Sequence, residues 1–142
     1  LPAGTRVAYG EIDLAALPPT EVALAREIPR FPATSRDLSL EIPLALPAAE
    51  VLAALRSAAA AVAGAQPGPG DDPVHLQAEG IELLEDYRGA GVPEGHRALL
   101  LRLHYAAAGR SVTDLEVSPQ HAAIVERACL ALRERAPGVR PR

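Results

Sequence analysis

The side chains that could carry out catalysis are few and scattered along the chain. Its 142 residues include four His and one Cys. The histidines, at positions 75, 96, 104 and 121, lack the HxxxH and HExxH spacings of a metal site, and a single Cys cannot build a zinc site. Gly89-Ala90-Gly91 is not followed by a predicted helix, so it does not form a phosphate-binding loop. We therefore expect this part of the protein to be non-catalytic, with no metal site and no cofactor of its own.

The remaining reactive side chains have simpler explanations. Asp71-Asp72 and Glu85-Asp86 are adjacent carboxylates, which point to opposite sides of an extended chain and are typical of solvated charge. Cys129 falls on a stripe of apolar residues at helical spacing, where a small buried side chain is expected. These residues predict structure rather than chemistry.

Charge is distributed unevenly along the chain. The net charge of −4 argues against a generally basic nucleic-acid binder. Residues 1–86 carry five Arg against 13 acidic residues, a net of −8, whereas residues 87–142 carry nine Arg against five acidic residues, a net of +4. An anionic partner is therefore expected to bind the second half.

Composition indicates one soluble domain. The chain is long enough for one hydrophobic core, and no run of 18 apolar residues or signal-peptide pattern predicts a membrane protein. A cytoplasmic location and a monomeric state in isolation are expected, and the single Cys agrees with a reducing compartment. The sequence has no Met, which leads us to expect a fragment or a processed product.

The first 30 residues are expected to be separate from the rest. Thr5–Ile12 and Glu21–Ile28 are β-type runs around a Pro-rich middle, and alone they would make at most a marginal ribbon. We interpret residues 1–30 as the tail of a preceding domain or a linker, with extended conformation, and residues 31–142 as the folded domain.

The domain shows an alternation of strands and helices. Leu38, Leu40 and Ile42 lie on one side of a predicted strand over 36–42. Pro47 and Glu50 begin a helix over 47–63, and Gly64 ends it. A Pro- and Gly-rich surface loop over 65–73 precedes a second strand over 74–88 that contains a bulge at Gly80.

The second half continues the alternation. A hairpin loop rich in Gly leads to a strand over 96–105. Thr113 and Glu116 form a capping box for a second helix, which is expected to kink at Pro119 or to restart there with Ser118 as its cap. Pro137-Gly138 ends that helix, and residues 139–142 are predicted to form a short last strand.

This order, βαββαβ, predicts an α+β fold of the ferredoxin-like type, a four-stranded antiparallel sheet with two helices on one face. The other face is then left open. The alternation assigns these residues to the open face: Ser39, Glu41, Ala98, Leu100, Arg102 and His104.

Three motifs resemble one known family. Residues 31–40, FPATSRDLSL, resemble the FPAxxRDLAL opening of the ferredoxin-fold anticodon-binding domain that closes the β subunit of bacterial phenylalanyl-tRNA synthetase. Residues 87–99, YRGAGVPEGHRAL, are similar to its YxGxGVPEGxxSL hairpin, and residues 113–117, TDLEV, to its TDEEV helix start. The resemblance covers about residues 31–142, and Val7–Ile12 and Pro18–Glu27 resemble the end of the preceding synthetase-like core more weakly.

The resemblance implies recognition of the anticodon stem-loop of the phenylalanine tRNA through the open sheet face. Ser39, Tyr87 and Ala98 match the family positions that face the anticodon, and Tyr87 is expected to stack on an unpaired base. Arg97, Arg102 and His104 are predicted to contact phosphates or base edges. Catalysis, with ATP and magnesium, would belong to the parent aminoacyl-tRNA synthetase, an (αβ)₂ assembly with an α subunit.

Two alternatives remain open at this point. Tyr87 could instead pack under the hairpin loop as a partly buried aromatic residue. The domain could also be a ferredoxin-like protein-interaction or regulatory module that does not bind RNA, docking a partner through its helices or a sheet edge.

Overall fold

The structure is a computed structural model that describes residues 7–17, 30–64 and 72–142. Its folded part contains β1 (Thr34–Pro43), α1 (Ala48–Gly64), β2 (His75–Tyr87), β3 (His96–Ala106), α2 (Asp114–Arg135) and β4 (Arg140–Pro141). The predicted βαββαβ order is confirmed, with each of these elements close to its expected bounds.

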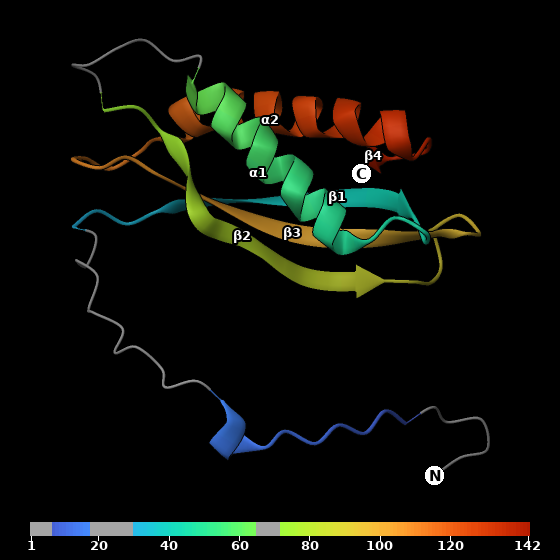
Figure 1. Ribbon diagram of the computed structural model, residues 1–142. Coiled ribbons are helices and arrows are strands. Elements are labelled where there is room, and N and C mark those ends of the chain that lie inside the picture. The colour runs from blue at the N-terminus through green and yellow to red at the C-terminus, as the bar shows by residue number, and fades with distance from the viewer. Residues whose placement is uncertain (1–6, 18–29, 65–71) are drawn as a thin grey trace.

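The strands form one four-stranded sheet in the order β2-β3-β1-β4, with the pairs β2–β3, β3–β1 and β1–β4 all antiparallel. Both helices lie on the same face of this sheet (Figure 1). No helix of the described residues covers the opposite face, which we call the open face. The predicted ferredoxin-like α+β fold is therefore confirmed.

The core lies between the sheet and the two helices, as the alternation of the strands predicts. Alternate positions of β1 and β3 supply buried apolar side chains to this core: Leu38, Leu40, Ile42, Leu99, Leu101, Leu103 and Tyr105. They pack in one cluster with the inner sides of the helices, which contribute Val51, Leu55, Val117, Ile124, Ala128, Cys129 and Leu132. Cys129 is thus a core residue, as predicted.

Helix α2 begins with the expected capping arrangement. The Glu116 carboxylate accepts hydrogen bonds from the Thr113 N–H at 2.9 Å and from its hydroxyl at 2.7 Å. The helix then runs from Asp114 to Arg135 with Pro119 inside it, so of the two predicted alternatives, a kink or a restart, the restart at Ser118 is wrong. The Ser118 hydroxyl instead donates to the Asp114 carbonyl at 2.7 Å, which satisfies a first-turn acceptor next to the bond that Pro119 removes.

The connection between β2 and β3 consists of two successive tight turns. The N–H of Val92 donates to the carbonyl of Gly89, and the N–H of His96 donates to that of Pro93. Gly91 and Gly95 are the third residues of these turns and have φ angles of +83° and +77°. A positive φ at that position is the requirement of a type II turn, which explains the two glycines.

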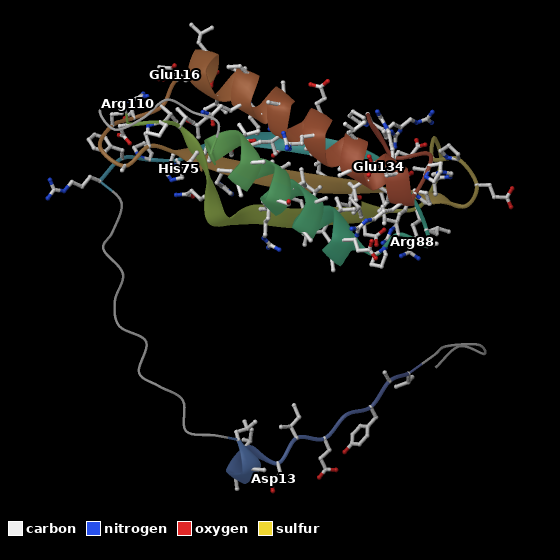
Figure 2. The ribbon with its side chains drawn as sticks, turned by 45° about the horizontal axis from the view of Figure 1, so that its top comes forward. Asp13, His75, Arg88, Arg110, Glu116 and Glu134 are labelled. Atoms are coloured by element: carbon white, nitrogen blue, oxygen red, sulfur yellow. The ribbon has the colours of Figure 1, made fainter. Side chains whose placement is uncertain are left out.

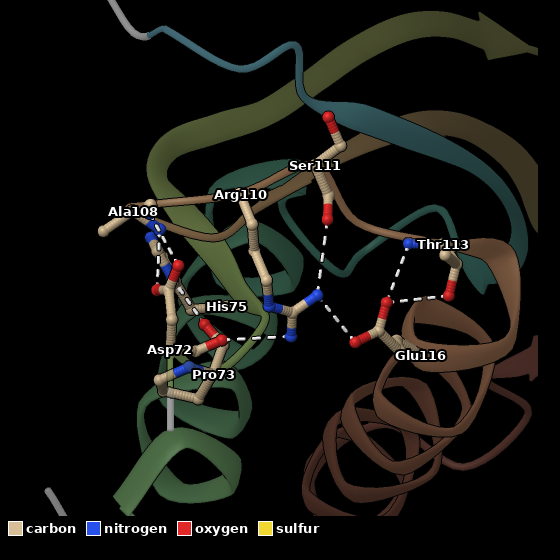
Figure 3. Close-up of polar contacts among 9 residues, drawn as sticks. Asp72, Pro73, His75, Ala108, Arg110, Ser111, Thr113 and Glu116 are labelled. Carbon is tan, nitrogen blue, oxygen red and sulfur yellow. Dashed lines mark hydrogen bonds and ion pairs between the residues drawn. The ribbon is translucent and has the colours of Figure 1, made fainter. Parts of the chain in front are cut away.

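At the opposite end of the domain, the Asp72 carboxylate joins the start of β2 to the turn after β3 (Figure 3). It accepts hydrogen bonds from the backbone N–H groups of Ala108 and Gly109 at 2.8 and 2.6 Å. Arg110 then bridges the Asp72 carbonyl and the Glu116 carboxylate at the start of α2. Figure 2 shows Arg110 and Glu116 at this end and Arg88 at the hairpin end.

The N-terminal residues differ from the prediction. Residues 7–13 form no strand, Leu14–Ala16 form a short 3-10 helix, and all side chains over 7–17 are exposed. The strand expected over Thr5–Ile12 is therefore wrong where the structure describes it, because no strand among the described residues pairs with it. Glu21–Ile28 and the loop over 65–71 lie outside the described residues. Within the described ranges, no helix is long and apolar enough to cross a membrane.

Candidate nucleic-acid interface

The direction of Tyr87 depends on a bulge in β2. Leu83 pairs with Leu101, but Glu85 pairs with Leu100, so Leu84 is one extra residue. Side chains alternate between the two faces of a strand. The extra residue therefore moves every later side chain of β2 to the face opposite the one that an unbroken strand would give it. It pairs Tyr87 with Ala98 on the open face, whereas an unbroken strand would turn Tyr87 toward the helices.

The Tyr87 ring is partly exposed and leans on the hairpin. Its exposed fraction is 39%, and its hydroxyl donates to the Ala90 carbonyl at 3.3 Å. A Cβ atom on Gly89 would lie only 2.8 Å from the ring carbon Cζ, so the ring lies directly against the backbone of the loop. The hairpin thereby holds the aromatic ring in one place while leaving part of its surface accessible.

Ser39 and Ala98 lie on the same face as Tyr87. Ala98 stands between Tyr87 of β2 and Glu41 of β1 in one cross-strand row, and Ser39 pairs with Leu100 in the next row. Ser39 is half-buried, and Ala98 is only 6% exposed. The structure therefore brings together the three positions that the family resemblance selected. Ala98 is the small residue between the larger side chains of Tyr87 and Glu41.

Arg97 lies on the other face and is not available at the surface. It pairs with Ile42, is 8% exposed, and its guanidinium donates to the Leu46 carbonyl and to the Asp86 carboxylate, both at 2.7 Å. The Arg88 hydrogen bonds and the Arg97 charge hold the pKa of Asp86 below its usual value. Arg97 therefore fixes the hairpin to the β1–α1 connection, and we leave it out of the interface.

Arg102 and His104 lie on the open face but next to carboxylates. The Arg102 guanidinium donates to both oxygens of Asp37, at 2.7 and 2.9 Å, and these hydrogen bonds keep the pKa of Asp37 low. The Nε2 atom of His104 lies 3.3 Å from a Glu82 oxygen, without the angles of a hydrogen bond. The Arg102 charge is therefore compensated within the protein by Asp37.

Sequence reasoning did not identify Arg140. This residue of β4 pairs with Glu41 of β1, and its guanidinium lies 2.8 Å from the Glu41 carboxylate. Glu41 was assigned to the open face, but its burial was not predicted, and only 4% of its side chain is exposed. The signal was the predicted last strand over 139–142, whose pairing with β1 brings a cation to this position.

The open face as a whole is not basic. Its charged residues, as the strand registers place them, are Asp37, Glu41, Glu82, Glu85, Arg102 and Arg140, with Arg142 two residues further on the same side, where its N–H donates to the Ser39 carbonyl. A surface with this balance favours stacking and hydrogen bonding over the neutralisation of many phosphates. Among the residues that the structure describes, no group of three or more His, Cys, Asp or Glu side chains could hold a metal ion.

Comparison with known proteins identifies phenylalanine–tRNA ligase beta subunits among the relatives of the chain. The chain is 37% identical over 115 residues to the phenylalanine–tRNA ligase beta subunit of Leifsonia xyli, which covers 79% of the chain. The beta subunits of Symbiobacterium thermophilum, 37% identical over 99 residues, and Trichormus variabilis, 33% identical over 91 residues, cover 70% and 64%. The matched segments span only 9–12% of the length of these relatives. No protein-family model matches the chain.

Proposed function

We propose, because this chain belongs to the family of phenylalanine–tRNA ligase beta subunits as a domain-sized segment, that it binds the anticodon stem-loop of the phenylalanine tRNA. The proposed binding surface is the open sheet face at the hairpin end. Its function would be to hold the tRNA while aminoacylation takes place elsewhere in the assembled enzyme.

The observation that carries this proposal is the position of Tyr87. The bulge at Leu84 turns this residue to the open face, and the hairpin holds its ring partly exposed beside Ala98. In single-stranded RNA recognition, stacking of an unpaired base on such a ring contributes about 1–3 kcal/mol to the binding free energy. Ser39, which is half-buried on the same face, lies in the next cross-strand row.

The charge distribution of the domain supports binding of an RNA stem-loop, but with moderate affinity. Residues 87–142 carry a net charge of +4, but the open face itself carries more carboxylates than Arg residues. Binding should therefore depend on salt only through a few phosphate contacts. We infer that other parts of the parent enzyme provide most of the tRNA affinity. Binding of ATP, magnesium and the α subunit also belongs to those parts.

The test is binding of an isolated anticodon stem-loop to the chain at low salt, followed by fluorescence anisotropy. Tyr87→Ala should weaken binding more than about tenfold, because it removes the stacking surface. Tyr87→Phe keeps the ring and loses only the hydrogen bond to Ala90, so its affinity should stay within about threefold of the wild type.

A stem-loop with a different anticodon but the same stem serves as the RNA control. If the wild-type chain binds neither RNA at low salt and sediments as a tight dimer through the sheet face, the protein-interaction alternative replaces the proposal. Equal binding by the wild type and Tyr87→Ala would remove Tyr87 from the interface.

A further inference from the structure

One cross-strand row runs over all four strands at the hairpin end of the open face. It consists of Tyr87 in β2, Ala98 in β3, Glu41 in β1 and Arg140 in β4. Neighbouring strands are about 4.8 Å apart, so the two outer residues stand roughly 14 Å from each other at the backbone. The row thus has an aromatic ring at one end, a cation at the other and a small residue between them.

Glu41 is unusual in this row because it is a carboxylate buried on a face that no described helix covers. Its side chain is 4% exposed, and its Oε1 atom lies 2.8 Å from a terminal nitrogen of Arg140. A charge removed from water requires a partner, and here the guanidinium is that partner. The pair therefore restricts Arg140 to a small set of orientations above the row.

Arg140 is more accessible than Arg102 and Arg97. Its side chain is 60% exposed, and a terminal nitrogen of its guanidinium makes the Glu41 contact. Arg102 directs two nitrogens at Asp37 and is 40% exposed, and Arg97 is buried on the opposite face. Arg140 can donate to a second anionic group without giving up its contact with Glu41.

We propose that Arg140, oriented by the buried Glu41, is a cation of the open face that contacts an RNA phosphate when a base is stacked on Tyr87. This inference rests on the proposed function and adds to it a residue pair and the chemistry that the pair recognises. Glu41 is a positioning residue, and Arg140 is the residue that touches the ligand. Arg102 has no such role because two nitrogens of its guanidinium already donate to the Asp37 carboxylate.

The test measures the affinity for the anticodon stem-loop at several salt concentrations. Arg140→Gln alone would leave Glu41 buried without its partner, so the double variant Glu41→Gln with Arg140→Gln is made as well and its folding is checked by thermal melting. Both are expected to bind about tenfold or more weakly at low salt, with a slope of log K against log salt that is smaller by about one. Arg140→Lys should keep the slope.

Arg127→Gln is the matched control, because it removes the same charge from an exposed position on α2, on the helix side of the domain. It should bind the stem-loop like the wild type. If the wild type binds and the folded double variant binds equally well with the same salt slope, the inference about Arg140 is wrong. If the wild type itself does not bind, the proposed function fails first.

Discussion

Replacing Arg97 with Met tests whether this residue belongs to the fold or to the RNA surface. The substitution removes two charge-assisted hydrogen bonds of 2.7 Å, one to the Leu46 carbonyl and one to Asp86. Such bonds contribute about 1.5–3 kcal/mol each, but the Asp86 contact counts for less because that carboxylate is 32% exposed and also accepts from Arg88. The unfolding free energy should therefore fall by about 2–4 kcal/mol.

Thermal melting followed by circular dichroism measures this loss. A domain of about 110 residues has an unfolding entropy near 0.23 kcal/mol/K, so the melting temperature should fall by roughly 9–17 °C. Arg102→Met is the control, since its ion pair with Asp37 is exposed and should shift the melting temperature by less than about 4 °C. A melting temperature of Arg97→Met within about 2 °C of the wild type would refute the structural role of Arg97.

Two further predictions concern the core and the end of the domain opposite the hairpin. The Nδ1 atom of His121 lies 2.9 Å from the Tyr105 hydroxyl, and burial lowers the pKa of this imidazole in the folded protein. As the pH falls, His121 therefore binds a proton in the unfolded chain before it does so in the folded one. The unfolding free energy should decrease below about pH 6.5 and level off below the folded pKa. Urea unfolding at several pH values measures this, and a His121→Gln variant with an unchanged pH dependence would contradict it. Backbone N–H groups of Gly109 and Ala108 keep the pKa of Asp72 low, so the stabilisation they provide should be present above about pH 4 and lost as the pH falls through the lowered pKa. In Asp72→Ala, hydrogen exchange at these two amides should become several-fold faster at neutral pH, with the amides of β3 as an internal reference.

Local patterns in the sequence were enough to predict the architecture. The alternation over 36–42, the capping box at Thr113 and Glu116, and the glycines between β2 and β3 each specify an element through short-range physics. Their order then allows few topologies other than a ferredoxin-like sheet. Thr5–Ile12 shows the limit of this approach, because a β-type run becomes a strand only if another strand pairs with it.

The candidate site could be predicted only in part, because it depends on how strands pair. The position of Tyr87 requires the extra residue at Leu84, which a run of Leu83-Leu84-Glu85 does not reveal by itself. Arg97 could have been recognised as inward-facing, since it precedes the outward-facing Ala98, but its partner, the carbonyl of Leu46, is 51 residues away in the chain. The same is true of Arg102 with Asp37 and of Arg140 with Glu41, whose contacts appear only with the register.

The two irregularities in β2 also influence how the protein behaves at high concentration. β2 and β4 are the outer strands of the sheet, where an unpaired backbone can add a strand from another molecule. Register shifts between Leu76 and Ile81 and between Leu83 and Glu85 interrupt the regular spacing of the β2 backbone. The same strand carries the exposed carboxylates of Glu82, Glu85 and Asp86. At the other edge, β4 is two residues long and includes Pro141, which has no N–H to donate. Neither outer strand offers a long regular template, so the sheet resists edge-to-edge aggregation while its open face stays uncovered.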